Sequence, residues 1–118
     1  MKVFLRFNRR FREGAVVYIK KFTFTAEERK KTIEAFFKDG ILRELPSKEK
    51  KKIIIFLELI KKFEGGVTYS EKEVNERLSL IFADFAILRR YLVDYQLLER
   101  SKDCRDYWVN EYVADQIK

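Results

Sequence analysis

The fold is decided by residues 70–100, SEKEVNERLSLIFADFAILRRYLVDYQLLER. The first four residues form a capping-box pattern, Ser followed three positions later by Glu, which predicts the start of a helix that runs to about Ile81. Asp84 is placed to cap a second helix, Phe85–Tyr95, after a turn of two or three residues. Two helices in such close succession are typical of a helix-turn-helix.

The residues on either side extend this pattern. Downstream, Leu97–Arg100 and Asp106–Val109 have the composition of two strands joined by a turn. Upstream, Val67–Tyr69 is a short strand candidate, and Ser47 is placed to cap a helix over Lys48–Phe63. The middle of that helix, IIIFLELI, is apolar on nearly every side, which is typical of a buried helix. The order predicts a mainly α fold with a small β wing, an α+β domain of winged helix-turn-helix type.

One more helix precedes this set. Thr25, with Glu three residues later, is another capping-box pattern, and Asp39-Gly40 marks the end of the helix that it begins. Ile41–Leu45 then forms an extended connector. Two short apolar runs nearer the N-terminus, 3–7 and 15–19, can pair as a loose hairpin.

Charge divides the chain unevenly. Residues 1–21 carry seven Lys or Arg against one Glu, a net charge of +6, whereas residues 22–118 carry 19 cations against 18 acids, or +1. A basic arm favours a polyanionic partner such as nucleic acid or an anionic membrane surface, and the alternative is a leader that only aids solubility. We therefore divide the chain into a basic N-terminal arm at 1–21, a winged-helix-like domain at 22–109 and a C-terminal tail at 110–118.

The residue types that are missing narrow the chemistry. The chain has no His, and Cys104 is its one cysteine, which excludes an internal disulfide, Cys/His zinc sites and His-based catalysis. No apolar run approaches the roughly 18 residues of a membrane span, so we expect a cytoplasmic location. No carboxylate pairs with an obvious nucleophile or a Gly-rich phosphate loop. We expect a protein that is no enzyme and that needs no cofactor and no metal.

Four segments carry a resemblance to a known family. They are FFKDGILRELPSKEKKK from Phe36, FEGGVTYSEKEVNERL from Phe63, DFAILRRYLVDYQLLER from Asp84 and DYW from Asp106. Through them, residues from about 22 to 109 resemble the bacterial domain-of-unknown-function family 2087. The resemblance implies a winged-helix-type domain that occurs alone or attached to helix-turn-helix regulators or acetyltransferase-like domains, and thus work in transcription. The family commonly has Gly at the turn where this chain has Cys104, and the basic arm lies outside the resemblance.

The helix at 85–95 is the candidate reader of the major groove. At about 100° per residue, Arg90 points away from the predicted core and lies between Ala86 and Val93. A guanidinium between small apolar groups suits a base edge, with hydrogen bonds to guanine and methyl contacts to thymine. Arg89 lies at the border of the core. For both Arg89 and Arg90, the alternative to a DNA contact is an ion pair with Glu73 or Glu76 on the preceding helix.

Other cations are candidates for phosphate contacts. Lysines crowd the first turns of the helix at 48–63, either as a phosphate-contacting edge or because a core helix begins in solvent. Cys104 is expected at the turn between the last two strands, as a neutral replacement or as a redox-sensing thiolate favoured by the nearby Lys102 and Arg105. The full set of predicted DNA-contacting residues is Arg90, Arg89, Ala86, Val93, Arg6, Arg9, Arg10, Arg12, Lys48, Lys51, Lys52, Lys102 and Arg105.

These features favour a DNA-binding transcriptional regulator. The alternative is a protein-interaction or effector-binding module without DNA contact, because Glu71, Glu73 and Glu76 lie where a helix-turn-helix would cross the phosphate backbone. We also expect that an apolar strip of Ala86, Val93 and Ile87, or the aromatic arm, supports a homodimer.

Overall fold

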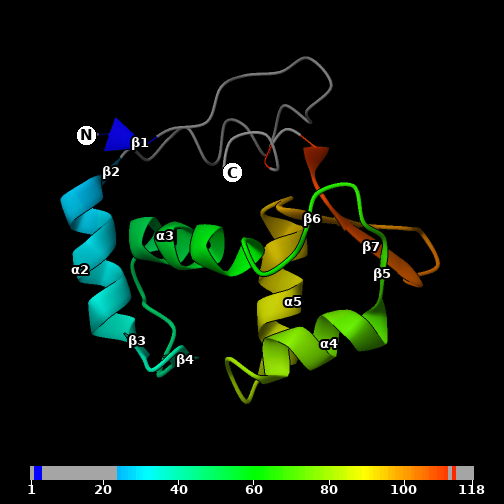
Figure 1. The fold of residues 1–118 in the computed structure, drawn as a ribbon, viewed down its shortest axis with the longest axis horizontal. Helices are drawn as coiled ribbons and strands as arrows, with labels where there is room; N and C mark the ends of the chain where they lie inside the picture. The colour runs from blue at the N-terminus through cyan, green and yellow to red at the C-terminus, as the bar shows by residue number, and fades with distance from the viewer. Residues whose placement is uncertain (1, 4–23, 112, 114–118) are drawn as a thin grey trace.

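Figure 1 shows the fold in a computed structural model, which describes residues 2–3, 24–111 and 113. Helices and short antiparallel strands alternate along the chain, which confirms the predicted α+β class with a predominance of helix. In chain order the elements are β1 (Lys2–Val3), β2 (Phe24–Thr25), α2 (Ala26–Phe36), β3 (Phe37–Lys38), β4 (Ile41–Leu42), α3 (Glu49–Ile60), β5 (Tyr69–Ser70), α4 (Glu71–Ser79), α5 (Phe85–Asp94), β6 (Leu98–Arg100) and β7 (Asp106–Val109).

Helix α2 begins at the predicted capping box. The Glu28 amide donates to Thr25 Oγ1 over 3.0 Å, and the Thr25 amide donates to Glu28 Oε1 over 3.1 Å. The helix ends at Phe36, earlier than predicted, because β3 and β4 pair as a hairpin. Asp39 and Gly40 turn this hairpin with φ values of 54° and 79°, the left-handed conformation that tight hairpin turns require.

Helix α3 is the buried helix that its sequence predicts. Its apolar run is almost wholly enclosed: Ile53, Ile54, Ile55, Phe56, Leu57, Leu59 and Ile60 are all buried. The helix packs against both α2 and α5, and an ion pair of 2.5 Å between Arg29 and Glu58 ties it to α2. The predicted cap at Ser47 is wrong. Lys48 holds the N-cap position with an extended backbone, and no side chain caps the helix.

The C-terminal half contains two helices and a three-stranded sheet. A capping box at Ser70 begins α4, and Asp84 Oδ1 accepts a hydrogen bond of 3.3 Å from the Ile87 amide at the start of α5. Five residues separate the helices, more than the predicted two or three, because α4 ends at Ser79 rather than near Ile81. The sheet has the order β5-β7-β6, and both of its ladders are antiparallel.

Residues assigned to the N-terminal arm and to the C-terminal tail both contact the predicted domain. Lys2 and Val3 pair with Thr25 and Phe24 in β2, while the predicted hairpin of 3–7 and 15–19 lies otherwise outside the described residues. The core includes Val113, whose amide donates to Asn110 Oδ1 over 3.3 Å. In the described part of the chain, no helix is long and apolar enough to cross a membrane.

Candidate functional site

The rotation of α5 about its axis is fixed by its apolar side. Leu88 and Leu92 are fully buried. Tyr91 stacks on Phe56 of α3 and Tyr95 meets the same ring edge-on, each with ring centroids 5.2 Å apart. Burial raises the pKa of the Tyr95 phenol. These contacts turn the opposite side of α5 toward solvent.

Arg89 joins α5 to α4. Its Nη1 donates to Asn75 Oδ1 and lies 3.4 Å from Glu71 Oε1, and its side chain is only 23% exposed. The structure has the predicted contact between Arg89 and α4. The predicted partner, Glu73 or Glu76, is wrong, because the acid beside Arg89 is Glu71. Glu73 is engaged by the capping box, where its Oε1 accepts from the Ser70 amide over 2.9 Å. That amide, followed by the Ser70 side chain, lowers the pKa of Glu73.

Arg90 has the opposite character. It is exposed, and it makes no hydrogen bond or ion pair with any described residue. Ala86 is exposed and Val93 is half-buried, so the three side chains form one stripe along α5 at positions i, i+4 and i+7. We call Ala86, Arg90 and Val93 the α5 stripe.

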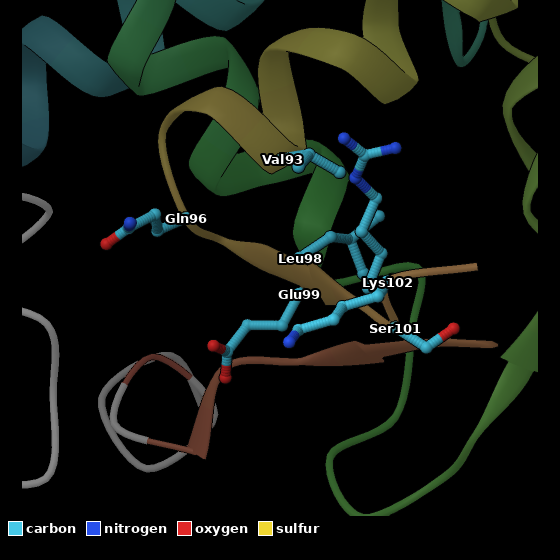
Figure 2. A pocket seen from close by; sticks show the side chains of 7 residues that line it. Val93, Gln96, Leu98, Glu99, Ser101 and Lys102 are labelled. Atoms are coloured by element: carbon cyan, nitrogen blue, oxygen red, sulfur yellow. The ribbon is translucent and has the colours of Figure 1, made fainter. Parts of the chain in front are cut away.

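The α5 stripe leads into a hollow beside the turn between β6 and β7. Figure 2 shows this hollow, which has a volume of about 300 Å³ and is lined by Val93, Gln96, Leu98, Glu99, Arg100, Ser101 and Lys102. Val93 and Lys102, two of the predicted contact residues, are thus brought together by the fold, with Arg100 added to them.

The turn itself is held by a set of local hydrogen bonds. Asp103 Oδ1 accepts from the Ser101 hydroxyl over 2.6 Å and from the Arg105 amide over 3.1 Å. These bonds, the hydroxyl first, lower the pKa of Asp103. Its carboxylate also lies 3.8 Å from Arg105 Nε, so that part of the Arg105 charge is offset.

Cys104 has a different cation beside it from the two that were expected. The guanidinium of Arg100 donates to Cys104 Sγ over 2.6 Å, whereas neither Lys102 nor Arg105 makes a hydrogen bond with the thiol. Cys104 has a φ of 61°, a left-handed conformation that favours glycine. This backbone fits the expectation that related chains commonly have Gly at the turn.

The predicted lysines of α3 do not gather on the α5 stripe. Lys52 Nζ lies 5.4 Å above the ring of Tyr91, so it borders the side of α5 that faces α3. Lys48 and Lys51 instead face α2, where Lys51 Nζ lies 5.9 Å from the centroid of Phe36. The arginines of the arm, Arg6, Arg9, Arg10 and Arg12, lie outside the described residues.

Sequence reasoning missed Arg100. The available signal was its place at the end of a predicted strand, one residue before the turn that holds Lys102. Among residues 24–111, no three Cys, Asp or Glu side chains are grouped so that they could hold a metal ion.

The fold defines a small α+β protein built on two successive helices and a three-stranded antiparallel sheet. Its sequence matches the family DUF2087, an uncharacterized protein conserved in bacteria, over residues 41–109. The chain belongs to this family. The matched segment begins at β4 and ends with β7, so it contains α3, α4, α5 and the whole sheet. Comparison with curated proteins and with solved structures found no match.

Proposed function

We propose that residues 41–109 form a winged helix that binds duplex DNA, and that the protein is a transcriptional regulator. The order α3, β5, α4, α5, β6, β7 and the strand order β5-β7-β6 support this arrangement. Helix α5 is then the helix that enters the major groove, and the turn between β6 and β7 is the wing.

The observation that carries the proposal is the contrast between two adjacent arginines. Arg89 is held by Asn75 and Glu71, whereas Arg90 is exposed and unpaired within the described chain. An unpaired guanidinium loses no protein contact when it binds a guanine edge. Ala86 and Val93 on either side offer methyl groups to thymine.

Phosphate contacts come from the periphery of this stripe. Lys102 and Arg100 lie at the hollow beside the wing, and Lys52 borders α5 from α3. The domain itself is nearly neutral, so most of the sequence-independent affinity falls to the basic arm. Its seven cations limit the slope of log K against log salt to about −6 per chain.

The test is a fluorescence-anisotropy titration of labelled duplexes at several salt concentrations. Because Lys2 and Val3 pair with β2, the arm is neutralised rather than deleted, by replacing Arg6, Arg9, Arg10 and Arg12 with Gln. This variant weakens binding to every sequence and flattens the salt slope by at most about 3.6.

Arg90→Ala separates base recognition from this general attraction. It costs about 1–3 kcal/mol on a preferred site, selected beforehand from a random library, and little on random DNA. Lys72→Gln is the matched control, since Lys72 is an exposed cation on α4 outside the stripe. An intact protein that binds no duplex at low salt refutes the DNA proposal.

A protein-interaction role is the second candidate. Leu80, between α4 and α5, is 76% exposed, and the neighbouring α4 carries the exposed acids Glu73 and Glu76. An exposed leucine is a contact that a protein partner can bury, whereas the acids repel DNA phosphates. Salt-sensitive binding that depends on the arm but ignores Arg90→Ala favours this candidate.

A further inference from the structure

A second hollow lies between α2 and the first turns of α3. Helices α2 and α3 are neighbours in Figure 1, and the hollow between their side chains has a volume of about 470 Å³. We call it the α2–α3 groove. Its lining residues come from two segments: Glu28, Lys31, Thr32, Ala35 and Phe36 from α2, and Lys48, Lys50, Lys51 and Ile54 from α3 and its N-cap.

The groove combines apolar surface with one polar group. Ala35, Phe36 and Ile54 supply the apolar part. Thr32, a largely buried residue, lines the same hollow.

The charges around the groove are strongly unbalanced. Four lysines line it against one acid, Glu28, which leaves a net charge of +3. Lys50 Nζ lies 2.5 Å from Glu28 Oε2, and this contact is the largest cause of the lowered pKa of Glu28. That pair neutralises itself. Lys48 and Lys51 have no acidic partner among the described residues, so their charges are available to a ligand.

The start of α3 adds donors to the same place. Lys48 is its N-cap, and no side chain accepts a hydrogen bond from the first-turn amides. The first amides of a helix lack partners within the helix and form the positive end of its dipole, where lysines are unfavourable and anions are stabilised. An anion near Lys48 would thus satisfy the amides and offset the repulsion between the lysines.

We propose that the α2–α3 groove binds a small organic phosphate monoester. The phosphate lies against Lys48, Lys51 and the first amides of α3, and the apolar part of the ligand packs on Phe36 and Ile54. A monoester carries between one and two negative charges near neutral pH, which matches the +3 surroundings better than a single carboxylate does. The proposal assigns Lys48 and Lys51 to this ligand instead of DNA, and it stands whether or not α5 binds DNA.

Phenyl phosphate is the probe, and the intact ¹⁵N-labelled chain is titrated with it by NMR. We expect the amide signals of Thr32, Ala35 and Lys51 to shift together along one saturating curve. Benzoate and inorganic phosphate bind at least fivefold more weakly, because the first carries only one negative charge and the second lacks the ring. Benzyl alcohol produces no saturating shift.

Two variants test the assignment. Lys48→Gln combined with Lys51→Gln weakens phenyl phosphate binding at least tenfold, whereas Lys72→Gln on α4 changes it less than twofold. All three lysines are exposed, so these substitutions leave the packing of the core unchanged.

Several results would overturn the proposal. They are equal binding of phenyl phosphate and inorganic phosphate, shifts spread evenly over lysines outside the groove, or equal affinity in the double variant and in Lys72→Gln. Binding of duplex DNA that is weakened tenfold by the double variant, with no saturable binding of phenyl phosphate, would return Lys48 and Lys51 to the DNA surface.

Discussion

Replacing Arg89 should destabilise the fold, while the same replacement at Arg90 should not. The two residues are adjacent on α5, carry the same charge and have the same helix propensity. They differ in what they contact: Arg89 bridges to Asn75 and Glu71 on α4, and Arg90 has no partner in the described chain. Methionine is the replacement of choice because it keeps an unbranched stem of similar helix propensity and removes the guanidinium.

The expected magnitude follows from the contacts. A hydrogen bond from a charged donor contributes about 1.5–3 kcal/mol, which sets the share of the bond to Asn75. The ion pair with Glu71 spans 3.4 Å between side chains that are 23% and 42% exposed, so it adds at most about 1 kcal/mol. We expect Arg89→Met to lower the free energy of unfolding by about 1.5–3 kcal/mol. Arg90→Met should change it by less than about 0.5 kcal/mol.

Urea unfolding of the full chain, followed by circular dichroism, measures both values. A double-mutant cycle of Arg89→Met with Glu71→Gln isolates the ion pair, with an expected coupling of about 0.3–1 kcal/mol. A loss of less than 0.5 kcal/mol for Arg89→Met would show that the bridge between α4 and α5 contributes nothing. An equal loss at Arg90 would remove the argument that its guanidinium is free to bind another molecule.

Four other predictions concern the core, a cap, a turn and the assembly. Ile54→Ala should cost about 2–5 kcal/mol in urea unfolding, since Ile54 is 2% exposed, and a cost below 1 kcal/mol would contradict its burial. The pKa of the Glu73 carboxyl is lowered from 4.5 by the Ser70 amide. The ionised carboxylate therefore contributes to stability above pH 4.5, and this contribution is lost as the pH falls through the lowered pKa. In thermal unfolding, the stability advantage of wild type over Glu73→Gln should shrink between pH 6 and pH 3. Cys104→Gly should raise the free energy of unfolding by up to about 1 kcal/mol, because glycine relieves the left-handed φ of 61°, and a decrease would mean that the contact with Arg100 matters more. Sedimentation velocity of the intact chain at high micromolar concentration should show a dimer, and a monomer there would argue against pairing through the apolar strip of Ala86, Ile87 and Val93 or through the arm.

Caps and turns were predictable where the decisive residues are neighbours in sequence. The boxes at Thr25 and Ser70 and the cap at Asp84 each need only a short side chain and an amide two or three positions away. Ser47 satisfied the same pattern and failed, because the extended backbone falls one residue later, at Lys48. The choice between these two adjacent polar residues is made by how α3 packs, which local sequence does not encode.

The sequence predicted what type of partner a side chain would have, but it did not predict which residue that partner would be. The helical wheel placed Arg89 at the core border beside α4, and the predicted partner was Glu73 or Glu76. The capping box engages Glu73, and Arg89 contacts Glu71 instead. The hairpin of β3 and β4 had a local signal, since Asp-Gly is a favoured hairpin turn. The α2–α3 groove had none, because Thr32 and Lys51 lie far apart in sequence and meet only when α2 packs on α3.

The fold sorts its cations into those that hold the structure and those that remain available. Arg29 pairs with Glu58, Lys50 with Glu28 and Arg89 with Glu71, while Arg77 donates to the Lys62 carbonyl over 3.0 Å and lies 4.9 Å above the Tyr69 ring. Each of these contacts joins two elements, so each charge is already used in packing. Among the cations without such a contact are Arg90 on the α5 stripe and Lys48 with Lys51 in the α2–α3 groove. A long exposed stripe fits a polymer, and an apolar hollow with a net charge of +3 fits a small anion, so the near-neutral total charge of the domain conceals two surfaces of different chemistry.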